Sequence, residues 1–322
     1  VSDVVLTNMV TGVPEKMGIG YEELVKIKRD LIMLISSGYG ASGPYARRVT
    51  MGGAMDGIAG FSWLRHYADQ SPDTATYSMH TDVVTSMNNS LAIMMAIYHR
   101  WATGKGLLVE TSGVEASLHQ IPAALMDYAL NGRVRVSTGN EDPNGVMAPH
   151  NVYPCKGTDA WVTITVTNES QWRSLVRAMG SPEWSQAPRF ATMHSRWTHR
   201  EELDKHIAAW TRTQDKHAAM HTLQETGVPA GAVYDQRDHA TDPQWKARGV
   251  YQPTQISTAG QYPLATSPWT MDGKRIGIRK PPPGIGQDNE YVFTELMGLR
   301  RAEIEALRKE QYIGDKPLEL EV

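Results

Sequence analysis

The chain is poor in cysteine, in long apolar runs and in surplus charge. Its 322 residues contain one cysteine, Cys155, which excludes an internal disulfide framework and a zinc site built from cysteines. No apolar run approaches the roughly 18 residues that a transmembrane helix requires, and mean hydropathy is -0.40. Lys+Arg 32 against Asp+Glu 35 gives a net charge of -3, which leaves no basic surplus for a nucleic-acid backbone. We therefore expect a soluble, cytoplasmic protein whose partners include neither a membrane nor a nucleic acid.

Short motifs for several familiar sites are missing or incomplete. Neither the G-x-S-x-G motif of a serine nucleophile nor the G-x-x-x-x-G-K-[ST] phosphate loop occurs. Gly38–Gly43 has the form G-x-G-x-x-G, but Pro44 follows at once, which disfavours a dinucleotide site. His217 and His221 stand one helical turn apart without the Glu of H-E-x-x-H, so a charged helix face is favoured and no metal is expected. Backbone N–H groups of the glycine loop remain candidates for binding a ligand or an oxyanion.

Apolar segments near the start predict a parallel sheet. Val4–Leu6 and Leu31–Ile35 are continuous apolar runs, and a helical stretch at Tyr21–Ile27 lies between them. Such strands are typical of a parallel sheet that is covered on both faces. The first residues lack an initiator Met and resemble a strand entered partway. We therefore expect that an upstream segment was removed, or that the chain is the second part of a longer polypeptide.

The remaining pattern predicts an α/β protein with two domains. Thr81–Trp101 carries apolar residues at three- and four-residue spacing, which predicts a long helix ending at Thr103–Gly106. We predict a parallel-sheet large domain at 1–149, a small α+β domain at 150–255, and a connector with C-terminal helices at 256–322. The other predicted elements are a strand at Leu107–Thr111, a helix at Val114–Leu130, a strand at Trp161–Val166, helices near 169–179, 200–210 and 215–226, and two helices within Asn289–Lys309.

Asp82 lies where a loop ends and the long helix begins. An acid at this position is commonly a helix cap or a first-turn residue that the free N–H groups and the helix dipole stabilise. The same position would keep the carboxylate ionised and oriented, and such a carboxylate can act as a nucleophile. From these residues alone both interpretations stay open.

Several motifs, in the same order, resemble the class III CoA-transferase family, also called the formyl-CoA transferase or CaiB/BaiF family. Ser37–Tyr45 resembles its S-G-Y-G-x-x-G-P-Y motif. Asp82, followed by Thr103–Gly106, resembles its catalytic aspartate, long helix and T-G-x-G turn. The other matches are Thr7–Gly18 with Gly20–Leu24, Gly139-Asn140, Ala148–Cys155, Gly227–Gly231, Asp242-Pro243-Gln244 and Arg248-Gly249. The resemblance extends from the first residue nearly to the last. It implies that the large domain is Rossmann-like and incomplete at its start, and that the C-terminal helices return to it.

The resemblance implies transfer of coenzyme A from an acyl-CoA donor to a small carboxylic acid. The Asp82 carboxylate would attack the thioester carbonyl, form a mixed anhydride, and then carry CoA as an aspartyl-CoA thioester. N–H groups of the Gly38–Gly40 loop or of the Gly139–Gly145 loop could stabilise the oxyanion. By the same resemblance, the CoA site would be lined by Asn8, Met9, Val13, Lys16 and Met17, with Ser37, Tyr39 and Gly40 beside the pantetheine. Lys16 stands where the family has Arg, and Met9 where it has Phe.

Two departures from the family pattern leave alternatives open. The family's first strand and helix, with much of the nucleotide site, are absent before Val1. Related proteins form interlocked dimers, so we expect a homodimer, or a separate or upstream N-terminal piece that completes the site. Arg47–Asp56 lacks the histidine base of related racemases, which disfavours a racemase or isomerase acting at the acyl-CoA α-carbon. A non-catalytic, CoA-binding part of a larger assembly is the third interpretation.

Overall fold

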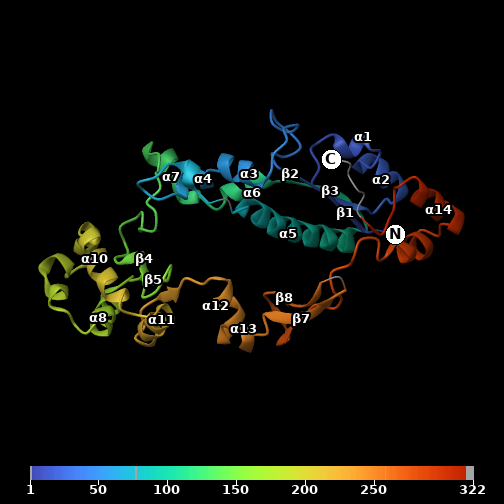
Figure 1. Ribbon diagram of the computed structural model, residues 1–322. Coiled ribbons are helices and arrows are strands. Elements are labelled where there is room, and N and C mark those ends of the chain that lie inside the picture. Colours follow the sequence, from blue (N-terminus) through green and yellow to red (C-terminus); the bar gives the residue numbers. More distant parts are fainter. Residues whose placement is uncertain (1, 77, 258, 317–322) are drawn as a thin grey trace. The chain divides into compact units, whose positions relative to one another are not determined.

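A parallel sheet organises the N-terminal region. In the computed structural model, which describes residues 2–76, 78–257 and 259–316, strands β1 (Val4–Thr7), β2 (Ile32–Ser37) and β3 (Leu107–Ser112) follow one another in the order β1–β2–β3 (Figure 1). The strands run in the same direction, with Val4 paired to Ile32 and Leu34 paired to Val109. Strand β2 lies at the centre of this order and its apolar side chains are buried. The predicted mixed α/β class with a parallel sheet is therefore confirmed.

Helices flank this sheet. Helix α2 (Tyr21–Ile27) connects β1 to β2, as the sequence predicts. Helix α5 (His80–Thr103) packs against β2, β3 and the short helix that follows β3. It ends at Gly104, whose φ of 71° is left-handed and suits glycine as the C-cap. The other helices before β3 are α1 (Val13–Lys16), α3 (Gly52–Ile58), α4 (Phe61–Leu64) and the 3-10 helix η1 (Pro72–Thr74).

The apolar stripe of α5 is exposed. The side chains at Met87, Leu91 and Tyr98 are 70%, 61% and 67% exposed, although their spacing follows one helix face. The residues of α5 that the fold buries are Thr81, Val84, Thr85, Asn89 and Ala96, of which three are polar. The helix is therefore present as predicted, but it turns a largely polar face toward the sheet and leaves its apolar stripe uncovered.

The helix predicted at Val114–Leu130 is wrong in its continuity. The structure contains two helices, α6 (Gly113–Leu118) and α7 (Pro122–Asn131). Pro122 occupies the start of α7, where its missing N–H is tolerated, but inside a single helix it would remove a hydrogen bond and clash with the preceding turn. Neither helix buries a continuous apolar face: α7 buries Asp127, and its Leu125 and Leu130 are exposed.

An antiparallel sheet organises residues 150–232. Strands β4 (His150–Pro154), β5 (Trp161–Thr165) and β6 (Ala230–Ala232) pair in the order β4–β5–β6. Its apolar core includes Val162, Ile164 and Leu175, all with no exposed surface. The predicted helices near 169–179, 200–210 and 215–226 are confirmed as α8, α10 and α11. The helical elements of this region are α8 (Glu169–Ala178), η2 (Glu183–Gln186), η3 (Pro188–Phe190), α9 (Met193–Thr198), α10 (Arg200–Thr211) and α11 (Lys216–Glu225).

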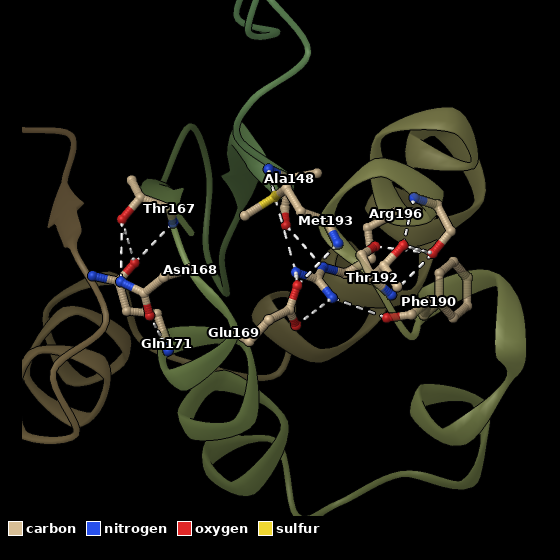
Figure 2. A network of polar contacts seen from close by, with 10 residues as sticks. Ala148, Thr167, Asn168, Glu169, Gln171, Phe190, Thr192, Met193 and Arg196 are labelled. Carbon is tan, nitrogen blue, oxygen red and sulfur yellow. Dashed lines mark hydrogen bonds and ion pairs between the residues drawn. The ribbon is translucent and has the colours of Figure 1, made fainter.

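A buried arginine ties this region together. The guanidinium of Arg196, fully buried in α9, donates hydrogen bonds to the carboxylate of Glu169 and to the carbonyl oxygens of Ala148 and Phe190 (Figure 2). It also lies over the Trp172 ring, 4.7 Å from its centroid. The charge is compatible with burial because its donors are bonded to a carboxylate and to backbone carbonyls.

The described residues from 233 to 316 belong to a second compact unit, and residues 2–232 belong to the first. The second unit contains hairpins, which the sequence pattern did not predict, and the C-terminal helical segments that it did predict. Its elements are α12 (Gln236–Thr241), α13 (Pro243–Ala247), β7 (Tyr251–Ile256), β8 (Gly260–Ala265), β9 (Thr270–Met271), β10 (Lys274–Arg275), the π-helix η4 (Tyr291–Leu296) and α14 (Arg301–Lys309). The predicted domain boundaries at 149/150 and 255/256 remain predictions. Among the described residues, no helix has the length and apolar character that crossing a bilayer requires.

Candidate active site

Asp82 lies in the first turn of α5 with its side chain exposed. Its backbone carbonyl accepts a hydrogen bond from the hydroxyl of Ser86, at 2.8 Å. In the part of the chain that the structure describes, its carboxylate has no hydrogen bond and no ion pair. The side chain is therefore a first-turn acid, and it does not cap its own helix.

The start of α5 is held by another carboxylate. The N-cap residue Met79 has a left-handed φ of 47° and makes no side-chain cap. Asp56, which is 5% exposed in α3, lies opposite. Its Oδ1 accepts hydrogen bonds from the N–H and the hydroxyl of Thr81, at 2.9 and 2.5 Å. Its Oδ2 accepts from the His80 N–H at 3.3 Å and from the Ser78 hydroxyl at 3.4 Å.

These hydrogen bonds decide the ionisation of Asp56. Burial by itself raises the pKa of this carboxyl group, but the hydrogen bonds from Thr81, His80 and Ser78 outweigh it, so the pKa falls below its ordinary 3.8. The helix start therefore holds an ionised carboxylate on its free N–H groups, while Asp82 stays available.

A cavity of about 710 Å³ opens beside Asp82. It lies between the carboxyl end of β2, helix α3 and the first turns of α5. Its lining residues are Leu6, Asn8, Ser36, Ser37, Gly38, Thr50, Met51, Gly52, Met55, Asp82, Thr85, Ser86, Asn89, Ser90, Ile93 and Gly113. In open parallel sheets ligands bind at the carboxyl ends of the strands, so the location suits a binding site. The cavity volume is within the usual range for a small-molecule site.

Two hydroxyl groups that line this cavity are buried without a hydrogen-bond partner among the described residues. They belong to Ser37 and Thr50. Ser37 is 5% exposed at the end of β2. Thr50 packs so tightly against Gly38 that a Cβ at residue 38 would overlap its methyl carbon. Because an unpaired buried hydroxyl is unfavourable, both groups are available for a bound ligand.

The cavity wall has a polar network on α5. The Asn89 amide donates to the Ser36 hydroxyl at 2.8 Å, and its oxygen accepts from the Thr111 hydroxyl at 2.6 Å. The three residues come from α5, β2 and β3, so the network fixes the helix against the sheet. The pattern of apolar residues along α5 carries no signal for it.

The predicted site residues separate into two groups. Asp82, Asn8 and Ser37 line the same cavity, although they come from three different segments. The other predicted CoA-site residues do not line it: Met9, Val13, Lys16, Met17, Tyr39 and Gly40. Met9 and Val13 are exposed, and Lys16 and Met17 lie at the exposed end of α1. Tyr39 and Gly40 lie in the loop after β2, where the Tyr39 ring contacts that of Tyr45.

Residues that the sequence did not single out complete the site: Asp56, Thr50, Met51, Thr85 and Asn89. None of these residues stands in a recognisable motif, although a helix start whose N-cap is Met needs an acceptor from another segment for its free N–H groups. The Gly139–Gly145 loop, the alternative source of oxyanion donors, is not part of the cavity lining. Within the described residues there is no cluster of His, Cys, Asp and Glu suited to a metal ion.

The site combines a carboxylate without a partner among the described residues, in the first turn of α5, with a cavity of ligand size. The sequence identifies the family. Residues 1–289 match the family described as CoA-transferase family III. The chain belongs to this family and is a class III CoA-transferase, an enzyme that transfers CoA between an acyl-CoA and a carboxylate.

The chain is similar to proteins that are named CoA-transferases and to a solved structure of the CaiB/BaiF family. The chain is 31% identical over 315 residues to the succinyl-CoA:D-citramalate CoA-transferase of Chloroflexus aurantiacus, covering 97% of this chain and 76% of that protein. It is 26% identical over 300 residues to the succinate:glutarate CoA-transferase of Agrobacterium fabrum, covering 93% and 74%. A crystal structure of a CaiB/BaiF family protein from Brucella suis is similar with a TM-score of 0.81 and 26% identity, covering 92% of this chain and 75% of that one.

Proposed function

We propose that this enzyme transfers CoA from an acyl-CoA to a small carboxylic acid through covalent intermediates on Asp82. The single observation that carries the proposal is the Asp82 carboxylate, which has no partner in the described chain and lines a cavity of about 710 Å³. A carboxylate that is not engaged by the protein is free to attack a bound thioester.

The first half of the reaction moves CoA onto the enzyme. A carboxylate oxygen of Asp82 attacks the thioester carbonyl carbon, the C–S bond breaks, and CoA leaves as the thiolate while a mixed anhydride forms. The thiolate then attacks the aspartyl carbonyl, the anhydride C–O bond breaks, and the donor acid leaves as its carboxylate. The product is an aspartyl-CoA thioester. Each step displaces a leaving group without a net change of protons.

The second half reverses this sequence with the acceptor. An acceptor carboxylate attacks the aspartyl-CoA carbonyl, and the C–S bond breaks. This step releases the CoA thiolate and leaves a second anhydride between the acceptor and Asp82. The thiolate then attacks the acceptor's carbonyl carbon, so the new acyl-CoA forms and Asp82 is restored as a carboxylate. A carboxylate is a weak nucleophile, so orientation and exclusion of water must supply much of the acceleration.

Ser37 and its loop support the placement of CoA. The Ser37 hydroxyl is buried, unpartnered among the described residues, and lines the cavity beside Asp82. A pantetheine arm offers amide groups that can bond to such a hydroxyl. N–H groups of the Gly38–Gly40 loop would stabilise the oxyanion, and one such donor contributes roughly 3–4 kcal/mol. Lys16 would bind a CoA phosphate outside the cavity as a single positive charge.

The exposed stripe of α5 supports a homodimer. Met87, Leu91 and Tyr98 are mostly exposed, and a contiguous apolar helix face of this kind is typical of an interface. The family resemblance implies an interlocked dimer, and we propose that a second copy of the chain covers this stripe.

The test of the nucleophile is the isosteric variant Asp82→Asn. We expect it to lower kcat for CoA transfer at least about 1000-fold, because the attacking oxygen is lost. Hydroxylamine added together with acyl-CoA should trap the acylated aspartate, and peptide mass spectrometry should locate the modification at residue 82. The matched control is Glu22→Gln, which neutralises an exposed first-turn acid of α2 and should keep full activity.

Each alternative predicts a different result. If Asp82→Asn transfers CoA at the wild-type rate, the aspartyl mechanism is wrong. Incorporation of solvent deuterium at the acyl α-carbon without CoA exchange would indicate an isomerase. That result is not expected, because the residues lining the cavity in the described chain include no histidine, lysine or tyrosine that could act as the base.

A further inference from the structure

The first turn of α5 carries the proposed nucleophile, but the turn does not cap itself. Its N-cap is Met79, which has no side-chain oxygen and lies in the left-handed region at a φ of 47°. A helix start leaves several N–H groups without an intrahelical partner, and these groups need acceptors from elsewhere. In this chain the acceptor comes from α3, 26 residues before Asp82 in the numbering.

Asp56 binds both the backbone and the side chain of one residue. The Thr81 N–H and the Thr81 hydroxyl both bond to its Oδ1, and the Thr81 side chain is fully buried. The His80 N–H bonds to its other oxygen. The ring of His80 also makes an edge contact with Phe61 of α4, with centroids 4.9 Å apart. The helix start is therefore restrained both in position and in rotation about its axis.

The restraint on Thr81 decides where Asp82 points. Successive residues in an α-helix are turned by about 100°, so holding Thr81 against Asp56 directs the next side chain away from it. Asp56 also accepts from the His80 and Thr81 N–H groups, so the positive end of this helix already has a carboxylate partner. With those donors occupied, the Asp82 carboxylate need not fold back on its own helix and can face the cavity.

We infer that Asp56 is a positioning residue, which caps α5 from α3 and thereby holds the Asp82 carboxylate free and oriented toward the acyl-CoA. This inference rests on the proposed function, because it assigns Asp56 a role through the Asp82 nucleophile. Asp56 makes no contact with substrate in this role. Substitution of Asp56 should therefore lower kcat and leave the KM for acyl-CoA unchanged, since substrate binding uses other residues.

The experiment compares Asp56→Asn with the same substitution at another aspartate that accepts hydrogen bonds from a helix start. Asp215 caps α11 through the N–H groups of His217 and Ala218, so Asp215→Asn removes a similar charge from a helix start in the other sheet region. For both variants we would measure Tm, kcat and the KM for acyl-CoA. The amount of donor acid released when acyl-CoA is added without an acceptor would count the sites that form aspartyl-CoA, so that kcat is expressed per intact site.

We expect Asp56→Asn to lower kcat per intact site at least tenfold, with the KM for acyl-CoA within twofold of wild type. Asp215→Asn should lower Tm less, because Asp215 is exposed and Asn caps a helix about as well as Asp, and it should keep kcat per site. If Asp56→Asn does not fold, Thr81→Val and Thr81→Ser replace it. The valine variant loses the hydroxyl bond and should lower kcat several-fold, and the serine variant keeps that bond and should restore kcat.

The outcomes separate this inference from the proposed function. If Asp56→Asn keeps the wild-type kcat per site, or if its kcat per site falls no more than that of Asp215→Asn, Asp56 is only a structural cap. The inference is then overturned, while Asp82 remains the proposed nucleophile. Equal kcat for Thr81→Val and Thr81→Ser overturns it in the same way. If Asp82→Asn, measured alongside, keeps its activity, the proposed function and this inference are both wrong.

Discussion

Around the β4–β5–β6 sheet, buried polar side chains bond within the fold, whereas around the β1–β2–β3 sheet several do not. Arg196 has no exposed surface, yet its guanidinium binds Glu169 and two carbonyl oxygens (Figure 2). Ser37 and Thr50, near the parallel sheet, keep buried hydroxyls with no partner among the described residues. The first region is optimised for its own stability, and the second retains groups that a ligand can use.

Apolar surface differs in the same way between the two regions. In residues 150–232, the apolar core buries Val162, Ile164 and Leu223 completely. Helix α5 beside the parallel sheet instead exposes Met87 and Leu91. Unpaired hydroxyls and an exposed apolar stripe among the described residues make this region suited to binding.

The largest stability change should come from the buried arginine. Arg196→Ala leaves the carbonyls of Ala148 and Phe190 without their donor, and we expect the free energy of unfolding to fall by about 3–5 kcal/mol. Urea denaturation followed by circular dichroism measures it. The control is Arg189→Ala, which breaks an exposed ion pair with Glu202 and should change it by less than about 1 kcal/mol. Similar losses for both variants would contradict the view that burial makes the difference.

A charge on the exposed stripe should change the assembly. We expect Leu91→Glu to convert a homodimer into monomers and to reduce CoA transfer, because a carboxylate is costly to bury in an apolar interface. Sedimentation equilibrium of the wild type and the variant provides the masses. Lys205→Glu introduces the same side chain at an exposed position of α10 and should leave the mass unchanged. A monomeric wild-type protein would show that the stripe is not a homodimer interface.

The contributions of Asp56 and Asp204 to the free energy of unfolding should change with pH in opposite directions. The pKa of Asp56 is lowered, so its ionised form stabilises the fold above the unfolded value of 3.8, and this contribution is lost as the pH falls through the lower folded pKa. Burial raises the pKa of Asp204 despite hydrogen bonds from Tyr153 and Asn151. The folded state therefore holds that proton more tightly, and its contribution declines as the pH rises from 3.8 through the folded pKa.

Urea denaturation at several pH values would reveal these opposite slopes. The stability advantage of wild type over Asp56→Asn should grow as the pH rises from about 3 to 5. The advantage of wild type over Asp204→Asn should shrink as the pH rises above 4. The same slope for both differences would contradict the contrast between the two carboxyl groups.

The smallest effect should come from the proposed CoA-binding residues outside the cavity. Lys16→Ala is expected to raise the KM for acyl-CoA two- to fivefold, because one exposed charge contact contributes less than about 1 kcal/mol. Steady-state kinetics at constant ionic strength measures it. Lys26→Ala removes an exposed lysine of α2 that pairs with Glu23 and should leave KM unchanged. Equal KM values for both variants would place the CoA phosphates away from Lys16.

Much of the secondary structure could be predicted because it depends on local patterns. Continuous apolar runs predicted β1 and β2, and three- and four-residue spacing with Gly104 after its end predicted α5. The same spacing failed across Pro122, because the apolar residues after it, including Leu125 and Leu130, are exposed and do not mark a buried helix face. The hairpin of β7 and β8 was missed, since its strands are largely exposed and lack strong apolar alternation.

The site was predicted in part for a similar reason. Asp82, Asn8 and Ser37 stand in motifs that resemble those of one family, and the structure lines one cavity with all three. Thr50 and Asp56 carry no such local signal. Their importance arises from groups brought against them from distant segments, which no spacing along the chain encodes.

The sequence by itself determined the family, the order of the elements and the candidate nucleophile, because these follow from local composition and from motifs. Only the tertiary structure decided that Asp56 occupies the N–H groups at the start of α5 and that the Asp82 carboxylate is left without a partner in the described chain. The physical reason is that a free N–H must find an acceptor, and which acceptor reaches it depends on how α3 packs against α5.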